Sequence, residues 1–166
     1  MHQQKPTYTI VHGNIADYQG GAIVVPCWTN RDARIWPELT HSLDKTKRVP
    51  LFSAHFYPRS QLLGFESIIL AACYADADET ETSFYERASQ TTANVLRVAN
   101  ENGVDSIAFP LYMAGHQKGK LTEIVPAMVD EFEKHMKSGV NPSDITLYLF
   151  AEKDYKEARQ LIERRQ

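Results

Sequence analysis

Short apolar runs bounded by glycine, proline or polar residues recur along the chain and predict β-strands. The run at residues 22–26 is continuously apolar, which is typical of a strand covered on both faces of a sheet, and the run at 67–74 is more apolar than the one at 51–57. The other runs are shorter or mix apolar with polar positions. In chain order, strands are expected at residues 8–12, 22–26, 51–57, 67–74, 106–109 and 145–150.

Apolar residues at helical spacing predict a long helix in the middle of the chain. It begins after a capping threonine, either Thr80 or Thr82, and ends at Asn102, where Gly103 stops it. The residues expected on its inward face are Phe84, Ala88, Thr91, Val95 and Val98.

Two further helices are expected at residues 121–137 and 154–165, and Pro126 is tolerated near the start of the former. The polar segment 30–47 fits either a helix or a loop, because Pro37 interrupts its apolar stripe. The alternation of strand and helix in the second half favours an α/β fold with a mostly parallel sheet and right-handed crossovers. Such a sheet binds ligands at the carboxyl ends of its strands.

Composition limits the classes of partner and the location. With 166 residues, 43% hydrophobic and 23% charged, the chain is expected to form one domain spanning residues 1–166. A net charge of -3 gives no general attraction to nucleic acid or to an anionic membrane surface. No apolar run reaches the length of a membrane span, and the N-terminus lacks the apolar segment of a secretory signal. We therefore expect a cytoplasmic protein.

The histidines and cysteines do not form a metal-binding pattern. None of the six histidines pairs with another at the four-residue spacing of helical zinc sites. Cys27 and Cys73 each end an apolar run, which indicates buried thiols rather than a disulfide or a zinc site. Neither a metal nor a cofactor is expected.

The stretch SIAFPLYMAGHQKGKL, residues 106–121, starts as a buried strand and continues as a glycine-containing loop before a helix. Gly115 and Gly119 permit positive φ and let backbone amides approach a ligand. Because the N-terminus of a helix favours anions, phosphate is the natural ligand for this loop. The alternative is an ordinary strand-to-helix connection.

Two other residues of this loop are candidates for ligand contact. A neighbouring anion would favour the protonated form of His116 and make binding pH-dependent; the alternative is a solvated loop histidine. Tyr112 is expected to line the cleft, because aromatic side chains just beyond strand ends often form the wall of a ligand site.

Three segments together resemble a known family. They are VHGNIADYQGGAIVV, FYERASQTTANVLRVANENGVDSIAFP and DITLYLFAEKDYKEARQLIE. In this order they resemble the macro domain, an ADP-ribose-binding three-layer α/β/α sandwich with a mostly parallel mixed sheet. The resemblance spans most of the chain and is thin from about residue 30 to residue 65.

The resemblance implies where the adenine would bind. Gly13-Asn14-Ile15 is similar to the family's Gly-Asp-Ile turn, whose acid receives the adenine amino group. Asn14 can accept through its amide oxygen but carries no charge; alternatively, it closes an Asx turn on its own backbone. Ile15 resembles the apolar residue under the adenine. Phe150 resembles the aromatic against the adenine face; alternatively, it is the last core residue of its strand.

The resemblance also marks a phosphate loop. Pro110, Ala114, Gly115 and Gly119 look like the family's second phosphate loop, with one extra residue between the glycines. His116 stands where the family usually has a bulky apolar residue. This implies contact between the loop and the diphosphate.

The segment after residue 25 departs from the family. Where the family typically reads Val-Asn-Ala-Ala-Asn and a run of glycines, this chain reads VPCWTN and then RDAR. Arg31 or Arg34 could replace the missing amide donors with a charged fork. Asn30 and Asp32 are the nearest substitutes for the catalytic groups of members that hydrolyse ADP-ribose linkages, but both lie off the register.

The expected function is binding of ADP-ribose or a related nucleotide at the carboxyl ends of the strands, with an ADP-ribosylated protein as a further partner. One alternative is an ADP-ribosyl hydrolase that uses Asn30 and Asp32. The other is a degenerate macro fold whose surface binds a protein partner or a second copy.

Overall fold

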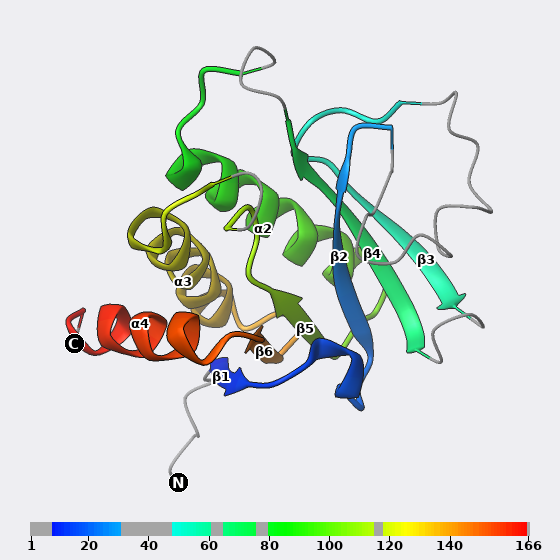
Figure 1. The fold of residues 1–166 in the computed structure, drawn as a ribbon. Helices are drawn as coiled ribbons and strands as arrows, with labels where there is room; N and C mark the ends of the chain where they lie inside the picture. Colours follow the sequence, from blue (N-terminus) through cyan, green and yellow to red (C-terminus); the bar gives the residue numbers. More distant parts are fainter. Residues whose placement is uncertain (1–7, 31–47, 61–64, 76–79, 115–117, 166) are drawn as a thin grey trace, which may run out of the picture.

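The computed structural model describes residues 8–30, 48–60, 65–75, 80–114 and 118–165, and Figure 1 shows their arrangement. Within these ranges the chain forms six strands, three α-helices and one short 3-10 helix. In order they are β1 (Tyr8–His12), η1 (Ile15–Asp17), β2 (Ala22–Trp28), β3 (Ala54–Ser60), β4 (Phe65–Tyr74), α2 (Phe84–Glu101), β5 (Ser106–Pro110), α3 (Leu121–Ser138), β6 (Asp144–Leu149) and α4 (Glu152–Glu163).

The strands form one mostly parallel sheet in the order β1-β6-β5-β2-β4-β3. Every neighbouring pair is parallel except β3 with β4, which is antiparallel. The expected mixed, mostly parallel α/β sheet is therefore confirmed. Pro58 lies within β3, the last strand of the described sheet.

The neighbouring strands β2 and β4 are buried on both faces, as the continuous apolar sequence of β2 predicts for that strand. Alternate residues of β2 and β4 belong to two separate apolar clusters. Val24 and Ile69 pack on the face that carries the helices, whereas Ile23 and Leu70 pack on the other face. The β-branched and aliphatic side chains of these strands thus supply both halves of the core.

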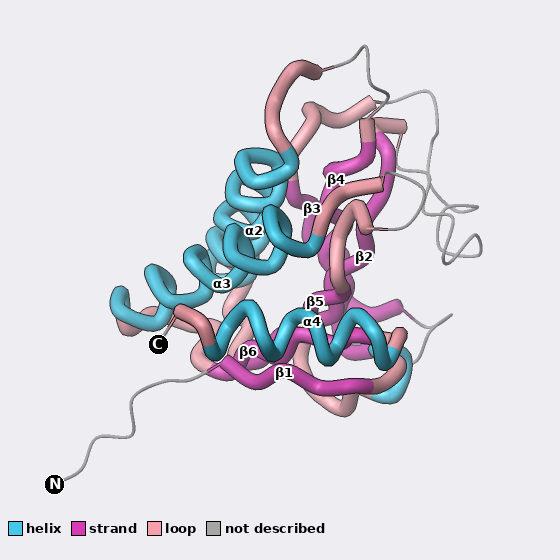
Figure 2. The backbone as a smooth tube through the Cα atoms, turned by 60° about the vertical axis from the view of Figure 1, so that its left-hand side comes forward, coloured by secondary structure: helices cyan, strands magenta, loops and turns pink. Residues whose placement is uncertain are grey.

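The described helices cover one face of the sheet. Apolar side chains of α2, α3 and α4 all join the same cluster as the strands beneath them. In Figure 2, α2 and α3 lie side by side next to the strands, and α4 lies along β1 and β6. The described residues thus contain the sheet and one helical layer of the sandwich. The segment expected as helix or loop at 30–47 lies, apart from Asn30, outside them.

The helices end near their predicted positions, with one change of cap. Neither Thr80 nor Thr82 caps α2; Ser83 does, and its Oγ accepts a hydrogen bond from the Glu86 N–H at 3.2 Å. Asn102 and Gly103 end the helix as expected, and Gly103 has a φ of +71°.

Several strand boundaries differ from the predicted ones by one to three residues, among them the start of β3 and the end of β6. β3 starts at Ala54 rather than at residue 51, because Phe52 has a φ of 71° and the Ser53 N–H donates to Pro50 in a turn. β6 ends at Leu149, so Phe150 lies just outside the strand.

Both cysteines are buried thiols, as predicted. Burial raises the pKa of the Cys73 thiol well above its usual range, so this thiol stays protonated. In the part of the chain that the structure describes, no helix is long and apolar enough to cross a membrane.

Candidate functional site

A cleft of about 510 Å³ lies where three neighbouring strands end. Its walls come from the residues that follow β1, β5 and β6, which are adjacent in the sheet (Figure 1). Parallel strands bring their carboxyl ends to one edge, so segments far apart in the sequence meet there. The lining residues are Gly13, Asn14, Ile15, Ala16, Pro110, Leu111, Ala114, Tyr148, Leu149, Phe150, Ala151 and Asp154.

The order of the strands explains why the sheet opens beside this cleft. From β5 the chain continues to β6 on one side, whereas from β2 it continues to β3 and β4 on the other. β2 and β5 pair only through Ala22 with Ile107 and Ile23 with Ala108. Beyond these pairs their carboxyl ends are no longer bonded to each other, which is the switch point where open α/β sheets bind ligands.

Asn14 lines the cleft with its side chain held by its own backbone. It is the N-cap of η1, and its Oδ1 accepts a hydrogen bond from the Ala16 N–H at 2.9 Å. The Asx-turn alternative is thus correct. Because the oxygen is engaged, the amide nitrogen, which has no partner among the described residues, is the group with free hydrogen-bonding capacity.

Phe150 is an exposed aromatic at the rim of the cleft. Its side chain is 78% exposed, so the alternative that it is the last core residue of its strand is wrong. It stands between the end of β6 and Ala151, the N-cap of α4, and lines the same cleft as Ile15. Leaving so large an apolar surface in water costs free energy, and a flat ligand stacked on it would remove that cost.

Asp154 is a cleft residue that the sequence interpretation missed. It lies in the first turn of α4, four residues after Phe150, and lines the cleft. As an acid in the first turn, it also favours the positive end of the helix dipole. The signal that would have found it is the spacing, because a helix starting directly after the rim aromatic turns its first-turn side chains toward the same edge.

The loop after β5 only partly matches its predicted role. Ala114 lines the cleft, whereas Gly115 and His116 lie outside the described residues. Gly119 does not adopt positive φ, which occurs instead at Met113 and Lys118, both at 58°. The Gly119 N–H donates to the Met113 carbonyl at 2.7 Å and is therefore already engaged within the chain.

Gly119 is instead required by close packing. A Cβ at this position would lie 2.8 Å from the Met113 carbonyl oxygen and 2.5 Å from Cδ1 of Ile124. Because contacts below 3.0 Å force neighbouring atoms to move, only glycine fits without strain.

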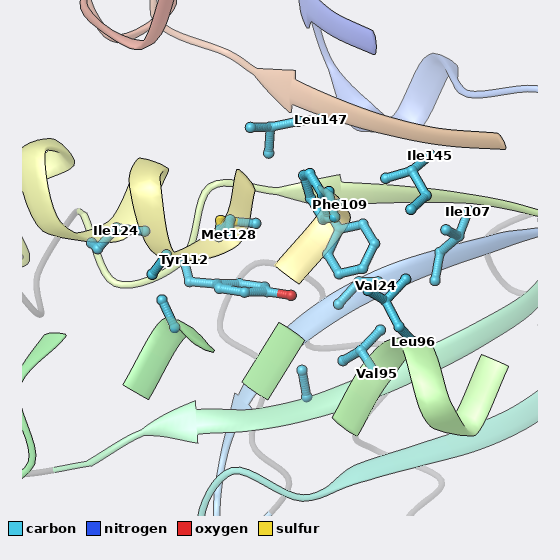
Figure 3. Close-up of a cluster of buried hydrophobic side chains, with 14 of the residues drawn as sticks. Val24, Val95, Leu96, Ile107, Phe109, Tyr112, Ile124, Met128, Ile145 and Leu147 are labelled. Atoms are coloured by element: carbon cyan, nitrogen blue, oxygen red, sulfur yellow. The ribbon is translucent and has the colours of Figure 1, made fainter. Parts of the chain in front are cut away.

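Tyr112 does not line the cleft, so that prediction is wrong. Its side chain is 0% exposed and lies among apolar residues of α2 and α3, as Figure 3 shows. The left-handed Met113 follows directly and turns the chain, so that both side chains enter the core. The large ring gains more free energy from burial there than from a place at the rim.

The Tyr112 hydroxyl is poorly satisfied. Burial raises its pKa well above the usual range, and the nearby Thr92 hydroxyl acts weakly in the opposite direction. Neither hydroxyl, however, makes a hydrogen bond of good geometry within the described part of the chain. The phenol therefore stays neutral and is held by packing.

Of the two predicted catalytic residues, Asn30 is the one that lies within the described residues. Asn30 lies in the turn after β2, at the same edge of the sheet, but is not among the residues that line the cleft. Asp32 lies outside the described residues, as do Arg31 and Arg34.

A larger hollow of about 700 Å³ lies at the opposite edge of the sheet. It is lined by residues at the amino ends of β2, β4 and β5, such as Gly21, Ser67 and Ser106. Size alone would favour it, but parallel strands direct ligands to the carboxyl ends, where the exposed aromatic also lies. We take the smaller cleft as the candidate site.

Comparison with known proteins identifies the fold. No protein-family model matches the sequence. An uncharacterized protein of Pyrococcus abyssi is 39% identical over 69 residues, which is 42% of this chain and 38% of that protein's length. The match therefore covers well under half of that relative and assigns no function.

Solved structures match a larger share of the chain than this relative does. A variant of the Oceanobacillus iheyensis macrodomain, solved with ADPR, superposes at a TM-score of 0.73 with 16% identity, covering 93% of this chain and 91% of that one. The Trypanosoma brucei macrodomain in complex with ADP-ribose superposes at a TM-score of 0.74 with 18% identity, covering 93% and 68%. The chain thus has the macrodomain α/β sandwich fold, as the sequence resemblance implied.

Proposed function

We propose that this protein binds ADP-ribose, or a related ligand with adenine, ribose and a diphosphate, in the cleft at the carboxyl ends of β1, β5 and β6. The observation that carries the proposal is the exposed Phe150, which lines one cleft together with Ile15 and Asn14. The complexes of macrodomains of the same fold with ADP-ribose support it.

The adenine would stack between apolar surfaces. Phe150 offers a flat face and Ile15 an aliphatic one at the same cleft. Stacking of a base on an aromatic side chain contributes about 1–3 kcal/mol and requires no particular base. Specificity must therefore come from polar groups nearby.

Two polar side chains would recognise the edge of the base. The Asp154 carboxylate can accept a hydrogen bond from the exocyclic amino group of adenine. It would thus replace the aspartate of the family's Gly-Asp-Ile turn. The Asn14 amide nitrogen, whose oxygen is tied to Ala16, can donate to a ring nitrogen. Together they offer one acceptor and one donor to adenine.

The diphosphate would lie along the loop between β5 and α3. Ala114 lines the cleft there, and the α3 N-cap, Lys120, makes no side-chain capping bond in the described structure. The Glu123 and Ile124 amides donate to the Lys120 carbonyl, each at 3.0 Å, so the amides of Leu121 and Thr122 are the ones proposed to bind an anion. Gly115 and His116 belong to the proposed phosphate contacts.

A protein that carries ADP-ribose is a further candidate partner, since it would present the same adenine and diphosphate to the cleft. Hydrolysis is not part of the proposal, because Asn30 does not line the cleft. What is proposed is a binding site.

The test is binding of ADP-ribose by calorimetry and thermal shift, with wild type and Gly115→Glu. The variant places bulk and negative charge where the diphosphate would lie, so the ligand-dependent rise in Tm should vanish. Val140→Glu is the matched control, because Val140 is exposed after α3 and is not part of the cleft. Absence of any wild-type response to ADP-ribose or ADP would overturn the proposal.

A further inference from the structure

Arg87 is a buried cation without an acidic partner in the described structure. It lies in the first turns of α2 and is only 5% exposed. Its Nε makes no hydrogen bond, and no carboxylate of the described residues forms an ion pair with it. By contrast, Arg97 on the same helix is exposed and pairs with Glu101 at 3.0 Å.

Arg87 lies beside the carboxyl end of β4, and β2 is the neighbouring strand in the sheet. Burial raises the pKa of Cys73, near the end of β4, and the Arg87 charge is close enough to act in the opposite direction. The next residue, Tyr74, has its ring centroid 5.8 Å from that of Trp28, which ends β2.

Arg87 also lies near the loop that leads into α3. Its guanidinium carbon is 4.9 Å from the centroid of the Phe84 ring. Cδ1 of that ring is 3.0 Å from the position a Cβ would take at Gly119. The guanidinium therefore stands among the ends of β2 and β4 and the loop after β5.

A buried guanidinium without a carboxylate is costly, because the charge loses its hydration and receives little in return. The cation–π interaction with the Phe84 ring offsets only part of the lost hydration free energy. An anion bound from solution would supply the rest. The planar fork of donors on arginine matches the oxygens of a phosphate group in particular.

We propose that Arg87 anchors a phosphate group of a ligand at the carboxyl ends of β2 and β4. This subsite goes beyond adenine binding in the cleft and does not require it. The phosphate is either free inorganic phosphate or part of a nucleotide ligand that extends from the cleft. In the latter case Arg87 provides charge on the side of the site where the glycine run of the family is missing.

The test compares Arg87→Met with the control Arg97→Met, which removes an exposed arginine from the same helix. Thermal stability is measured in sodium phosphate and in sodium chloride at equal ionic strength. Wild type and Arg97→Met should show a phosphate-specific rise in Tm, and Arg87→Met should show none. Without phosphate, Arg87→Met should be at least as stable as wild type, because methionine keeps the aliphatic chain and removes the uncompensated charge.

The source of the phosphate is decided by calorimetry. If the nucleotide supplies it, ADP-ribose should bind Arg87→Met about tenfold more weakly, while adenosine binds both proteins equally. If only inorganic phosphate is bound, ADP-ribose affinity is unchanged and the Tm response to phosphate is lost.

Two results would overturn the inference. One is a wild type with neither a phosphate-specific response nor an ADP-ribose affinity that depends on Arg87. The other is a Tm of Arg87→Met that rises in phosphate as much as that of wild type. Should that variant fail to fold, Arg87→Lys keeps the charge, loses the fork and should weaken the phosphate response. Failure of wild type to bind ADP-ribose would count against the proposed function, and the phosphate arm would still decide the role of Arg87.

Discussion

The two halves of the carboxyl edge of the sheet differ in how their chemistry is encoded. At the ends of β1, β5 and β6, residues marked by short sequence signals, Asn14, Ile15 and Phe150, line one cleft. At the ends of β2 and β4, Asn30 was predicted from the sequence but does not line the cleft. The residue that stands out there is the buried Arg87, which no sequence signal indicated. The candidate residues of the first half can be recognised from local sequence motifs. The candidate residue of the second half can be recognised only from its burial in the folded structure.

This difference has a physical cause. A turn residue and a strand-end aromatic are recognisable from their immediate neighbours, because local backbone geometry places them. An arginine on an amphipathic helix has the same local pattern whether it faces water or the core. Only the packing of α2 against β4 shows that Arg87 is buried.

The largest expected effect concerns the loop between the two halves. Gly119→Ala should lower the free energy of unfolding by about 1–3 kcal/mol, because the added Cβ meets the Met113 carbonyl. Denaturation in urea measures this. Gly13→Ala is the control, since its Cβ would make only ordinary contacts, the nearest at 3.7 Å. Unchanged stability with loss of ADP-ribose binding would show instead that the Gly119 amide contacts the ligand.

Phe150→Ala tests the half of the edge assigned to the base. The affinity for ADP-ribose should fall by about 1–3 kcal/mol, the usual contribution of stacking on an aromatic residue. Stability should change by less than about 0.5 kcal/mol because the side chain is exposed. Calorimetry and urea denaturation report the two quantities. Val140→Ala, another exposed apolar residue, should alter neither. A loss of stability without loss of affinity would return Phe150 to a structural role.

Asp154→Asn tests the polar recognition of the base. Replacing a charged acceptor should weaken ADP-ribose by about 1 kcal/mol and reduce the preference for adenine over hypoxanthine, which lacks the amino group. Competition between the two ligands measures the preference. Asp144→Asn makes the same change at the other end of β6 and should have no effect on it. An unaltered preference in Asp154→Asn would remove this residue from base recognition.

The smallest expected effect is that of Tyr112→Phe. Because the buried hydroxyl has no well-formed hydrogen bond, its removal should change stability by less than about 1 kcal/mol. ADP-ribose affinity should stay the same, since the residue is fully buried. A clear loss of affinity would place Tyr112 in the site after all.

Most of the framework follows from the sequence. The continuous apolar run at β2, the apolar run at β4 and the helical stripe at α2 correctly predict two strands and an inward helix face, because burial and backbone period act together there. The start of β3 was not predicted correctly. Phe52 adopts positive φ there, and an aromatic residue in the sequence gives no sign of that conformation.

Within the site, the sequence resolves what local geometry controls and misses what tertiary packing controls. The Asn14 turn was among the stated alternatives because an asparagine two residues before an amide donor can close it. The fates of Tyr112 and Gly119 depended on side chains of α2 and α3 far along the chain. The place of Asp154 in the cleft could not be predicted without knowing the direction of α4.

The proline within β3 has a consequence for association. An outer strand with free backbone groups is a template for pairing with another chain. Pro58 is paired in register with Ser67 of β4, and proline has no N–H to offer on the outer side. In the described sheet, this strand is thus a poor place for a second molecule to extend the ladder. Proline at this position therefore guards against aggregation through that edge.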